Sequence, residues 1–435
     1  MISGPNGSPC QSPLPFAPAL TAGTTSIQAG GFSPFTMTMS RPDGSQNLQA
    51  IQLKMPPGLL GTLASVKLCD EAKANAGTCG PESLIGHTTV SVGVGGDPFS
   101  VTGGQVFITE GYKGAPYGLS IVNPAKAGPF DLGHVIVRAK IEVDPISAVL
   151  TITTDTSGPY KIPTILDGIP LQIQHVNVAI DRPGFTFNPT NCSPLAITGS
   201  LTSDQSAVKG LSVPFQITNC AVLAFKPKLT AKTNGKTSRK AGASLSVKLT
   251  YPAGPYDANI SKVKVDLPRQ LPSRLETLQK ACPAKTFEAN PAACPEASIV
   301  GHAIAHTPVM PVPLSGPAYF VSHGGEEFPE LIIVLQGYGA TVHLVGSTFI
   351  SKTGITSSTF KTVPDVPVGT FELTLPQGKY SALAANKNLC TTTKLNMPTQ
   401  FIAQNGAVIK TTTPIVPTGC ARHKAHKAKK GKRRH

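Results

Sequence analysis

Residues 68–87, LCDEAKANAGTCGPESLIGH, bring two cysteines, three carboxylates and one histidine into twenty positions. Such a set could serve a thiol nucleophile, a metal site or an acid–base pair. Glu82 and His87 are the best acid–base candidates, because a carboxylate can orient an imidazole that acts as a general base. The chain contains neither G-x-S-x-G nor H-E-x-x-H, the motifs that would add a nucleophile or a zinc site. A loop-closing Pro-Glu turn and a histidine at the start of a strand explain the same residues, so we predict no catalytic residue.

The nine cysteines repeat their spacing along the chain. They lie at positions 10, 69, 79, 192, 220, 282, 294, 390 and 420, and the gaps 59, 10, 113 and 28 are followed by 62, 12, 96 and 30. The residues agree, since CDEAKANAGTCGPESLIGH (69–87) matches CPAKTFEANPAACPEASIVGH (282–302) with Cys, Cys, Pro-Glu and Gly-His in order. The chain therefore reads as two copies of a unit of about 200 residues. Glu296 and His302 are the second copy of the acid–base pair, but their separation is six residues instead of five.

This spacing also predicts which cysteines pair. The predicted disulfides are Cys69–Cys79, Cys192–Cys220, Cys282–Cys294 and Cys390–Cys420. Cys10 is the counterpart of Cys220 and has no cysteine before it, so we predict that it is unpaired and that the chain starts in the middle of an array. Zinc is the competing use of cysteines, but neither a C-x₂-C pair nor a Cys/His cluster occurs. We therefore predict no metal and no cofactor.

Persistent disulfides require an oxidising compartment, which predicts an extracellular or cell-envelope protein. Residues 1–13 lack the charged and apolar regions of a signal peptide. We therefore expect a preceding unit and the export signal to lie upstream of this chain. No stretch reaches 18 consecutive apolar residues, so no transmembrane segment is predicted.

Alternation of apolar and polar residues indicates antiparallel strands with one buried face. In 134–144 the residues Val135, Val137, Ala139, Ile141 and Val143 face one way, and Arg138 lies on the opposite, wet face. The same pattern occurs in 35–40, 245–251 and 263–267, and it changes phase in 171–181, which predicts a β-bulge near His175. Helical patterns are confined to 59–74 and 273–281, each leading into the first cysteine of a small loop. We predict a mainly β protein of tandem antiparallel sandwich-like units with short helical turns, stapled by disulfides.

The last residues of the chain form a basic tail. It carries eight fixed positive charges and no acid: Arg422, Lys424, Lys427, Lys429, Lys430, Lys432, Arg433 and Arg434. They account for more than half of the formal charge of +15 and leave +7 for the rest of the chain. A segment of this composition is expected to be disordered in isolation and to bind polyanions such as wall polymers by counterion release. No aromatic residue is interleaved, which disfavours nucleic acid; a purely solubilising tail is the other reading.

The first unit resembles repeats of large exported proteins of high-GC actinobacteria. The similar stretches are GGFSPFTMTMSRPDGSQNLQAIQLKMPPGLLG (30–61), APYGLSIVNPAKAGPFDLGHVIVRAKIEVDP (115–145) and RPGFTFNPTNC (182–192). The second unit is similar only loosely, and it ends in ALAANKNLC (382–390) in place of the Phe-Asn-Pro-Thr-Asn run. The resemblance implies export and a repeat architecture, and it assigns no activity and no site residue.

Together these patterns predict a first β unit in residues 1–219, a second in 220–420 and a tail in 421–435. We predict an exported, non-enzymatic structural or adhesive protein of the cell envelope. Its expected partners are neighbouring repeats and, through the tail, anionic envelope polymers. The alternative is a carbohydrate-active or other hydrolase with its site in a cleft at a sheet edge, which would require acids and aromatics to converge in one pocket.

Overall fold

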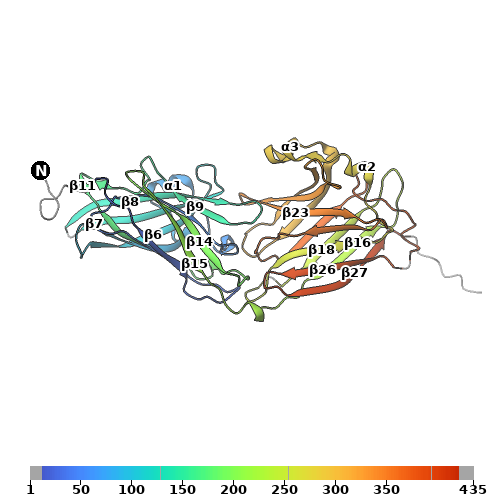
Figure 1. Cartoon of the computed structure of the whole chain (residues 1–435), viewed down its shortest axis with the longest axis horizontal. Coiled ribbons are helices and arrows are strands. Elements are labelled where there is room, and N and C mark those ends of the chain that lie inside the picture. Colours follow the sequence, from blue (N-terminus) through green and yellow to red (C-terminus); the bar gives the residue numbers. More distant parts are fainter. Residues whose placement is uncertain (1–11, 128, 253, 393, 421–435) are drawn as a thin grey trace, which may run out of the picture.

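The chain forms two β units that lie end to end along the long axis of the molecule (Figure 1). The computed structural model describes residues 12–127, 129–252, 254–392 and 394–420. The last strand of the first unit ends at Phe215, and the first strand of the second unit begins at Lys228. The mainly β class and the stapling by disulfides are confirmed.

The first unit is built from one large sheet, two small ribbons and short helical turns. Its elements are β1 (Ala19–Thr24), β2 (Phe35–Ser40), β3 (Leu48–Lys54), β4 (Leu60–Gly61), η2 (Leu63–Ser65), α1 (Glu71–Ala76), η3 (Pro81–Ser83), β5 (Leu84–Val92), β6 (Phe99–Thr109), β7 (Tyr117–Ala127), β8 (Phe130–Val143), β9 (Leu150–Thr154), β10 (Ile165–Leu166), β11 (Ile169–Pro170), β12 (Ile173–Ile180), β13 (Thr186–Phe187), β14 (Leu195–Ser203) and β15 (Val208–Phe215). The large sheet has the order β1-β2-β12-β5-β6-β7-β8-β9-β3-β14-β15. The sheet curves until β1 and β15 come into contact, so its concave face encloses the interior.

The second unit repeats this plan with its own helical turns. Its elements are η4 (Cys220–Val222), β16 (Lys228–Asn234), β17 (Leu245–Thr250), β18 (Ile260–Asp266), α2 (Leu275–Leu278), β19 (Cys282–Pro283), α3 (Ala284–Ala289), η5 (Pro291–Ala293), η6 (Glu296–Ser298), β20 (Ile299–His306), β21 (Leu314–Ser322), β22 (Glu330–Gly337), β23 (Ala340–Ile350), β24 (Thr356–Phe360), β25 (Thr370–Leu375), β26 (Asn396–Ala403) and β27 (Val408–Thr418).

The strands of the two large sheets have the same order of neighbours. Read from β16, the second sheet runs β16-β17-β25-β20-β21-β22-β23-β24-β18-β26-β27, which is the order of the first sheet element by element. The ends of the second sheet also join, because β16 and β27 pair in parallel from Ala231 opposite Ile415. The origin of the units as copies of one repeat, and the boundaries at 219 and 420, stay predictions.

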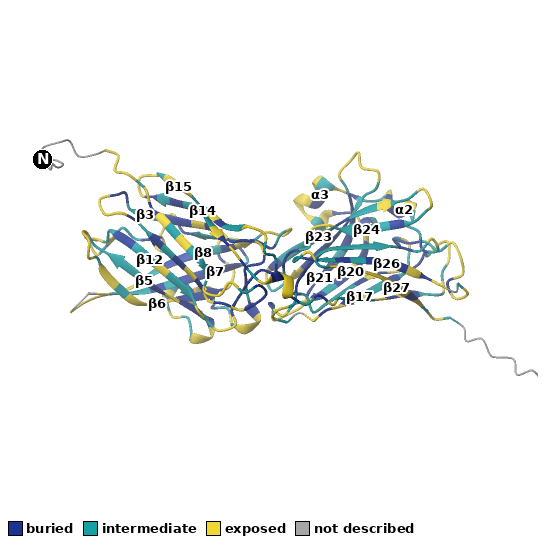
Figure 2. Ribbon diagram, turned by 60° about the horizontal axis from the view of Figure 1, so that its bottom comes forward, coloured by how far each residue is buried: buried dark blue, intermediate teal, exposed yellow. Residues whose placement is uncertain are grey.

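The alternating strands bury the faces that the sequence indicates. Phe35, Met37 and Met39 on β2 are buried, and so are Leu245 and Leu249 at the corresponding places on β17. Figure 2 shows exposed residues mainly in the turns and buried residues along the strands of both units.

Of the predictions about local structure, one needs correction and two are confirmed. Residues 59–74 are not one helix, because β4 and η2 occupy its first part and α1 begins only after Cys69, with Asp70 as its cap. The helical turn predicted in 273–281 is present as α2, before Cys282, and a further turn, α3, lies inside the second small loop. The β-bulge is confirmed: the register of β12 against β5 shifts between Ile173 and His175.

Candidate functional site

The first small disulfide loop is a compact clasp on the outer face of the first sheet. Cys69 and Cys79 are bonded, and the loop between them contains α1. The carboxylate of Asp70 caps this helix by accepting a hydrogen bond from the backbone N–H of Lys73 at 2.9 Å, and hydrogen bonds from Lys73 lower the pKa of Asp70. Gly77 ends the helix in the left-handed conformation, with φ of 69°. Asp70 is therefore a capping residue and not part of a catalytic set.

A buried arginine lies under this clasp, which corrects the prediction that Arg138 faces solvent. Its side chain is fully buried because α1 covers that part of the sheet. The guanidinium donates to the carbonyl of Leu119 at 2.9 Å, to the hydroxyl of Thr109 at 3.2 Å and to the amide oxygen of Asn75 in α1. The hydroxyl of Ser120 donates to the carbonyl of Ala74 at 2.7 Å. These bonds attach the clasp to β6, β7 and β8.

The charge of Arg138 is balanced at short range. Its guanidinium lies 4.1 Å from the ring centre of Tyr112, a cation–π contact. The hydroxyl of Tyr112 donates to Asp155 at 2.7 Å, and the ammonium of Lys113 lies 2.8 Å from the same carboxylate. Burial lowers the pKa of Arg138 and raises that of Tyr112. The group is an internal polar network that fixes the clasp.

The second clasp covers the corresponding place with apolar contacts. Cys282 and Cys294 are bonded around α3. Phe287 on α3 packs edge-on against Tyr319, with ring centres 5.5 Å apart. Val345 packs against this cluster and occupies the position that Arg138 has in the first unit. Val345 pairs with Ile332 of β22, and Arg138 pairs with Ser120 at the corresponding place of β7. The two clasps share a position and differ in the chemistry beneath them.

The predicted acid–base pairs are not partners in the structure. The ring of His87 contacts the carboxylate of Asp181 at 3.0 Å instead of Glu82, and both groups are largely exposed. In the second unit His302 is exposed on β20 opposite Thr374, and Glu296 lies in η6. Among the described residues, no cluster of His, Cys, Asp and Glu could hold a metal ion.

The Gly-His pair that both units retain has a packing explanation. Gly86 and Gly301 lie at bulges, where the register against the next strand shifts. A Cβ atom on Gly86 would lie 2.1 Å from the carbonyl oxygen of Ala179, and one on Gly301 would lie 2.6 Å from that of Thr374. Any larger residue would push the neighbouring strand away.

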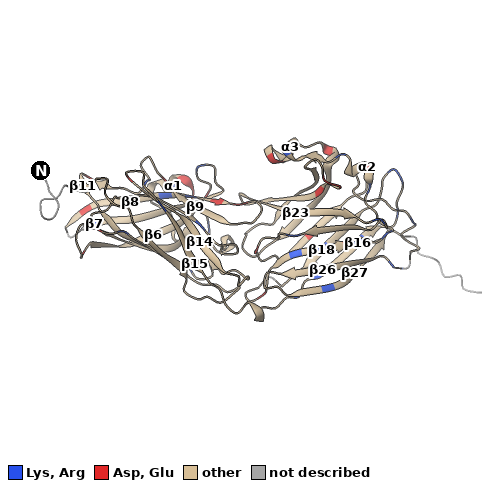
Figure 3. Cartoon of the chain, viewed as in Figure 1, with Lys and Arg blue, Asp and Glu red and all other residues tan. Residues whose placement is uncertain are grey.

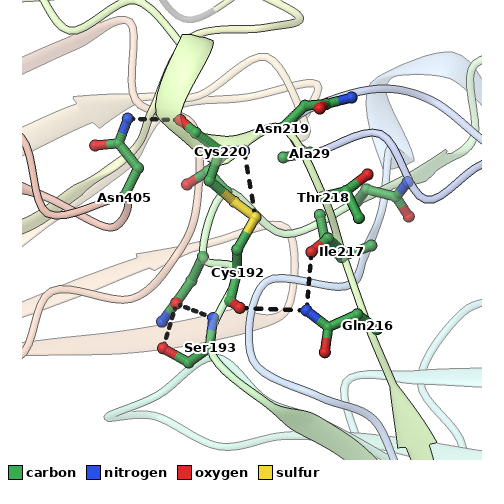
Figure 4. The surroundings of a disulfide bond; sticks show 12 residues. Ala29, Cys192, Ser193, Gln216, Ile217, Thr218, Asn219, Cys220 and Asn405 are labelled. Carbon is green, nitrogen blue, oxygen red and sulfur yellow. Dashed lines mark hydrogen bonds between the residues drawn. A yellow bond between two sulfur atoms is a disulfide. The ribbon is translucent and has the colours of Figure 1, made fainter.

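A disulfide fixes the joint between the two units (Figure 4). Cys192 is bonded to Cys220, the first residue of η4. The amide of Asn405, in the turn between β26 and β27, donates to the carbonyl of Cys220 at 2.8 Å. The disulfide of the first unit thus holds the connection into the second. Cys390–Cys420 occupies the equivalent place at the end of β27, directly before the tail.

A buried carboxylate from the second unit inserts into the first at this joint. Asp365 is 4 % exposed and accepts hydrogen bonds from the N–H and hydroxyl of Thr190 at 2.8 and 2.6 Å. The amide of Asn259 donates to it at 2.7 Å. Burial raises the pKa of the Asp365 carboxyl, while these hydrogen bonds oppose the rise. A Cβ atom on Gly58, whose φ is +85°, would lie 2.6 Å from the carboxylate, so the fit requires glycine there.

The interior of the first unit is hollow. A cavity of about 460 Å³ lies against the concave face of its sheet, and Met310 and Val309 of the second unit line one end. The inward-facing residues Ile121 and Val178 are only half-buried, because no side chain fills the centre. No acid is found among the described residues that line it, so the cavity lacks the carboxylates of a hydrolase.

Larger side chains fill the same region of the second unit. Val176 of β12 pairs with Met39 of β2. At the corresponding place in the second unit, Phe371 of β25 pairs with Leu249 of β17. Two residues further along, Val178 corresponds in the same way to Leu373, which is buried. The difference in side-chain volume along this strand is one cause of the hollow.

Several predicted residues lie outside the described part of the chain. They are Cys10 and the tail residues Arg422, Lys424, Lys427, Lys429, Lys430, Lys432, Arg433 and Arg434. In the described part, Figure 3 shows charged residues scattered over both units. None of the helices in that part is long and apolar enough to cross a membrane.

Comparison with known proteins finds only remote likenesses. No protein-family model matches the chain, and no curated protein matches it. Among solved structures, it is similar to the C-terminal domain of the Streptococcus pyogenes antigen I/II-family protein AspA at 8 % identity, covering 92 % of this chain and 99 % of that one with a TM-score of 0.22. A partial N-terminal region of enterococcal surface protein matches at 10 % identity, 95 % and 97 % coverage and a TM-score of 0.20. The B domain of a biofilm-associated protein matches at 10 % identity, 92 % and 84 % coverage and a TM-score of 0.17. At these TM-scores the likenesses carry no argument about fold or function.

Sequence reasoning missed three buried charged residues. Arg138 fits the wet face of an alternating strand, and nothing in its own strand predicts that a loop covers it. Asp365 stands between prolines in a segment that reads as a loop. Arg41 belongs to the turn sequence RPDGSQ, yet it is buried and donates to the carbonyl of Ile173 at 2.7 Å.

Proposed function

We propose that this chain is an exported, non-enzymatic structural or adhesive module of the cell envelope. The observation that carries the proposal is the joint between the units. A disulfide, a buried carboxylate with three donors and a continuous apolar contact hold the second unit on the first. Interfaces between domains that move are polar and lack such fixed contacts. A stiff pair of units is suited to hold a surface at a fixed distance from the cell.

The units follow each other head to tail. The turn before β21 and the turn before β23 of the second unit meet the first unit, where the N–H of Ala64 donates to Val309 and the hydroxyl of Tyr117 donates to the carbonyl of Tyr338 at 2.7 Å. A head-to-tail contact of this kind can be repeated along an array. It supports neighbouring repeats as partners.

The basic tail would hold the module on the envelope. It follows Cys420, which is disulfide-bonded at the end of the second unit, and carries eight of the positive charges of the chain. Phosphate-bearing or acidic wall polymers would bind it by counterion release, so retention should fall steeply as salt rises.

The test compares three proteins for retention on insoluble anionic wall material. These are the full chain, a chain ending at Cys420 and a chain of native length with the eight tail Lys and Arg residues replaced by Gln. We expect the full chain to be retained at 50 mM salt and released by 500 mM, and both variants to remain in solution. Equal retention of all three proteins would remove the tail from the proposal.

A further inference from the structure

The hollow interior of the first unit has no role in a structural module, which is most stable with a filled core. Its volume of about 460 Å³ is about three times that of an engineered apolar cavity that holds one benzene, which corresponds to roughly eighteen carbon atoms. The lining follows β8 from Leu132 to Val143, a span of about 35 Å. The cavity therefore suits a long, thin, apolar ligand.

One end of the cavity opens among exposed apolar residues. The cavity lining includes Phe99 at the start of β6 and Ile169 in β11, and both side chains are about half exposed. Phe130 at the start of β8 and Ile165 in β10 are also exposed, at 68 % and 60 %. These residues lie at one end of the unit. Phe99 pairs with Val92 at the end of β5, Phe130 pairs with the end of β7, and Gly93 donates to the carbonyl of Leu171, which follows β11; Figure 1 shows β11 and β7 at this end. A cluster of exposed apolar residues around an opening marks a place where apolar ligands enter.

A single cation lies at this opening. Lys126, near the end of β7, lines the cavity, and its ammonium is exposed and lies 2.9 Å from the carboxylate of Asp131. No other charged residue lines the cavity among the described residues. An acidic head group placed at the opening could therefore pair with Lys126 while its hydrocarbon chain fills the interior.

We propose that the first unit binds a single-chain amphiphile with an acidic head group, of which a long-chain fatty acid is the simplest. The hydrocarbon chain occupies the cavity and the carboxylate pairs with Lys126 at the opening. This end is the counterpart of the end by which the second unit meets the first, because the turns before β6 and β8 correspond to those before β21 and β23. A preceding repeat or a second copy of the chain could therefore contact it instead. Such a contact would cover the end but would leave the interior along β8 empty, so the ligand explains more of the structure.

The first experiment fills the cavity with residues that the second unit already accommodates. Val176→Phe combined with Val178→Leu gives β12 the side chains of Phe371 and Leu373. Both proteins are freed of bound lipid and titrated with cis-parinaric acid, a fluorescent fatty acid of eighteen carbons. We expect saturable binding at one site in the native chain and at least a tenfold weaker affinity in the variant. The ligand-free variant should also unfold at a higher temperature than the ligand-free native chain, because less of the cavity remains.

The second experiment tests the head group. Lys126→Gln is compared with Lys67→Gln, which alters an exposed lysine that does not line the cavity. We expect Lys126→Gln to weaken binding of the fatty acid about fivefold and to leave binding of the fatty alcohol of the same length unchanged. Equal effects of the two variants would overturn the assignment of Lys126.

Two results would overturn the proposal as a whole. One is a folded Val176→Phe/Val178→Leu variant that binds the probe as tightly as the native chain, which would place the probe on the outer surface. The other is a lipid-free native chain that binds no probe; if that chain is also dimeric by light scattering, the exposed end belongs to a second copy of the chain.

Discussion

Replacing Asp365 by alanine is expected to weaken the joint between the two units. The change leaves three buried donors without an acceptor: the N–H and hydroxyl of Thr190 and the amide of Asn259. Each unpaired buried donor costs about 1–3 kcal/mol. Removal of the carboxylate leaves space in which the Thr190 hydroxyl can reorient and water can bind the donors. We therefore expect the lower end of the summed cost of the three donors, about 3 kcal/mol. For a unit of this size that loss lowers the melting temperature by roughly 6–12 °C.

Calorimetry of the full chain measures this loss. Asp97→Ala is the matched control, because Asp97 is exposed and the same atoms are removed; we expect a change within about 0.5 kcal/mol. Small-angle scattering reports whether the two units also change their mutual orientation. The view that this carboxylate holds the joint would be refuted if Asp365→Ala had the melting temperature of Asp97→Ala and the scattering profile of the native chain.

The same carboxyl gives the joint a pH dependence of defined sign. Burial raises the pKa of Asp365 above its value in the unfolded chain, so the folded state retains the proton to higher pH. Its contribution to the free energy of unfolding is therefore greatest below the unfolded pKa of about 3.9 and declines as pH rises through the raised folded value. We expect the stability of the native chain relative to Asp365→Asn to fall with rising pH. A difference that rises with pH would show that the hydrogen bonds outweigh burial.

Three further substitutions test the clasp and the bulge by calorimetry. Replacing Cys69 and Cys79 together by serine should lower the free energy of unfolding by about 3 kcal/mol, the loop entropy of this short ring, and an unchanged stability would mean that α1 holds the loop alone. Arg138→Ala should cost about 3 kcal/mol, because it removes the centre of a buried network, whereas Arg138→Met keeps volume without the charge and should cost less; equal costs would contradict a contribution from side-chain volume. Gly86→Ala should cost about 2 kcal/mol by pushing the facing strand away, against less than about 0.5 kcal/mol for Gly96→Ala in open space.

The features that could be predicted from the sequence are those set by local pattern. The alternation in 35–40 and 245–251 fixes which side chains are buried, because a strand turns successive residues to opposite faces. The phase change in 171–181 locates the bulge for the same reason. The repeated cysteine spacing predicts pairs that the structure joins, Cys69 with Cys79 and Cys192 with Cys220.

The features that could not be predicted depend on residues far apart in the chain. Asp365 is buried because Thr190 and Asn259 meet it across the joint, and no local pattern contains that contact. Arg138 leaves the wet face only because a loop from about 60 residues earlier lies over it. The cavity depends on the summed volume of side chains from many strands, so the sequence of no single strand predicts it.

The two units share a plan and differ in what lies beneath the clasp and inside the sheet. Both have the same order of strands, a disulfide clasp at the same place and a disulfide after the last strands. Beneath the clasp, one unit has the network of Arg138 and the other the apolar cluster around Phe287. Because either chemistry supports the clasp, the clasp itself is the shared requirement. Inside the sheets, Val176 borders a cavity where the second unit has Phe371. A scaffold needs no such cavity, so the interior of the first unit, and not its cysteine loop, is where a ligand-dependent function would reside.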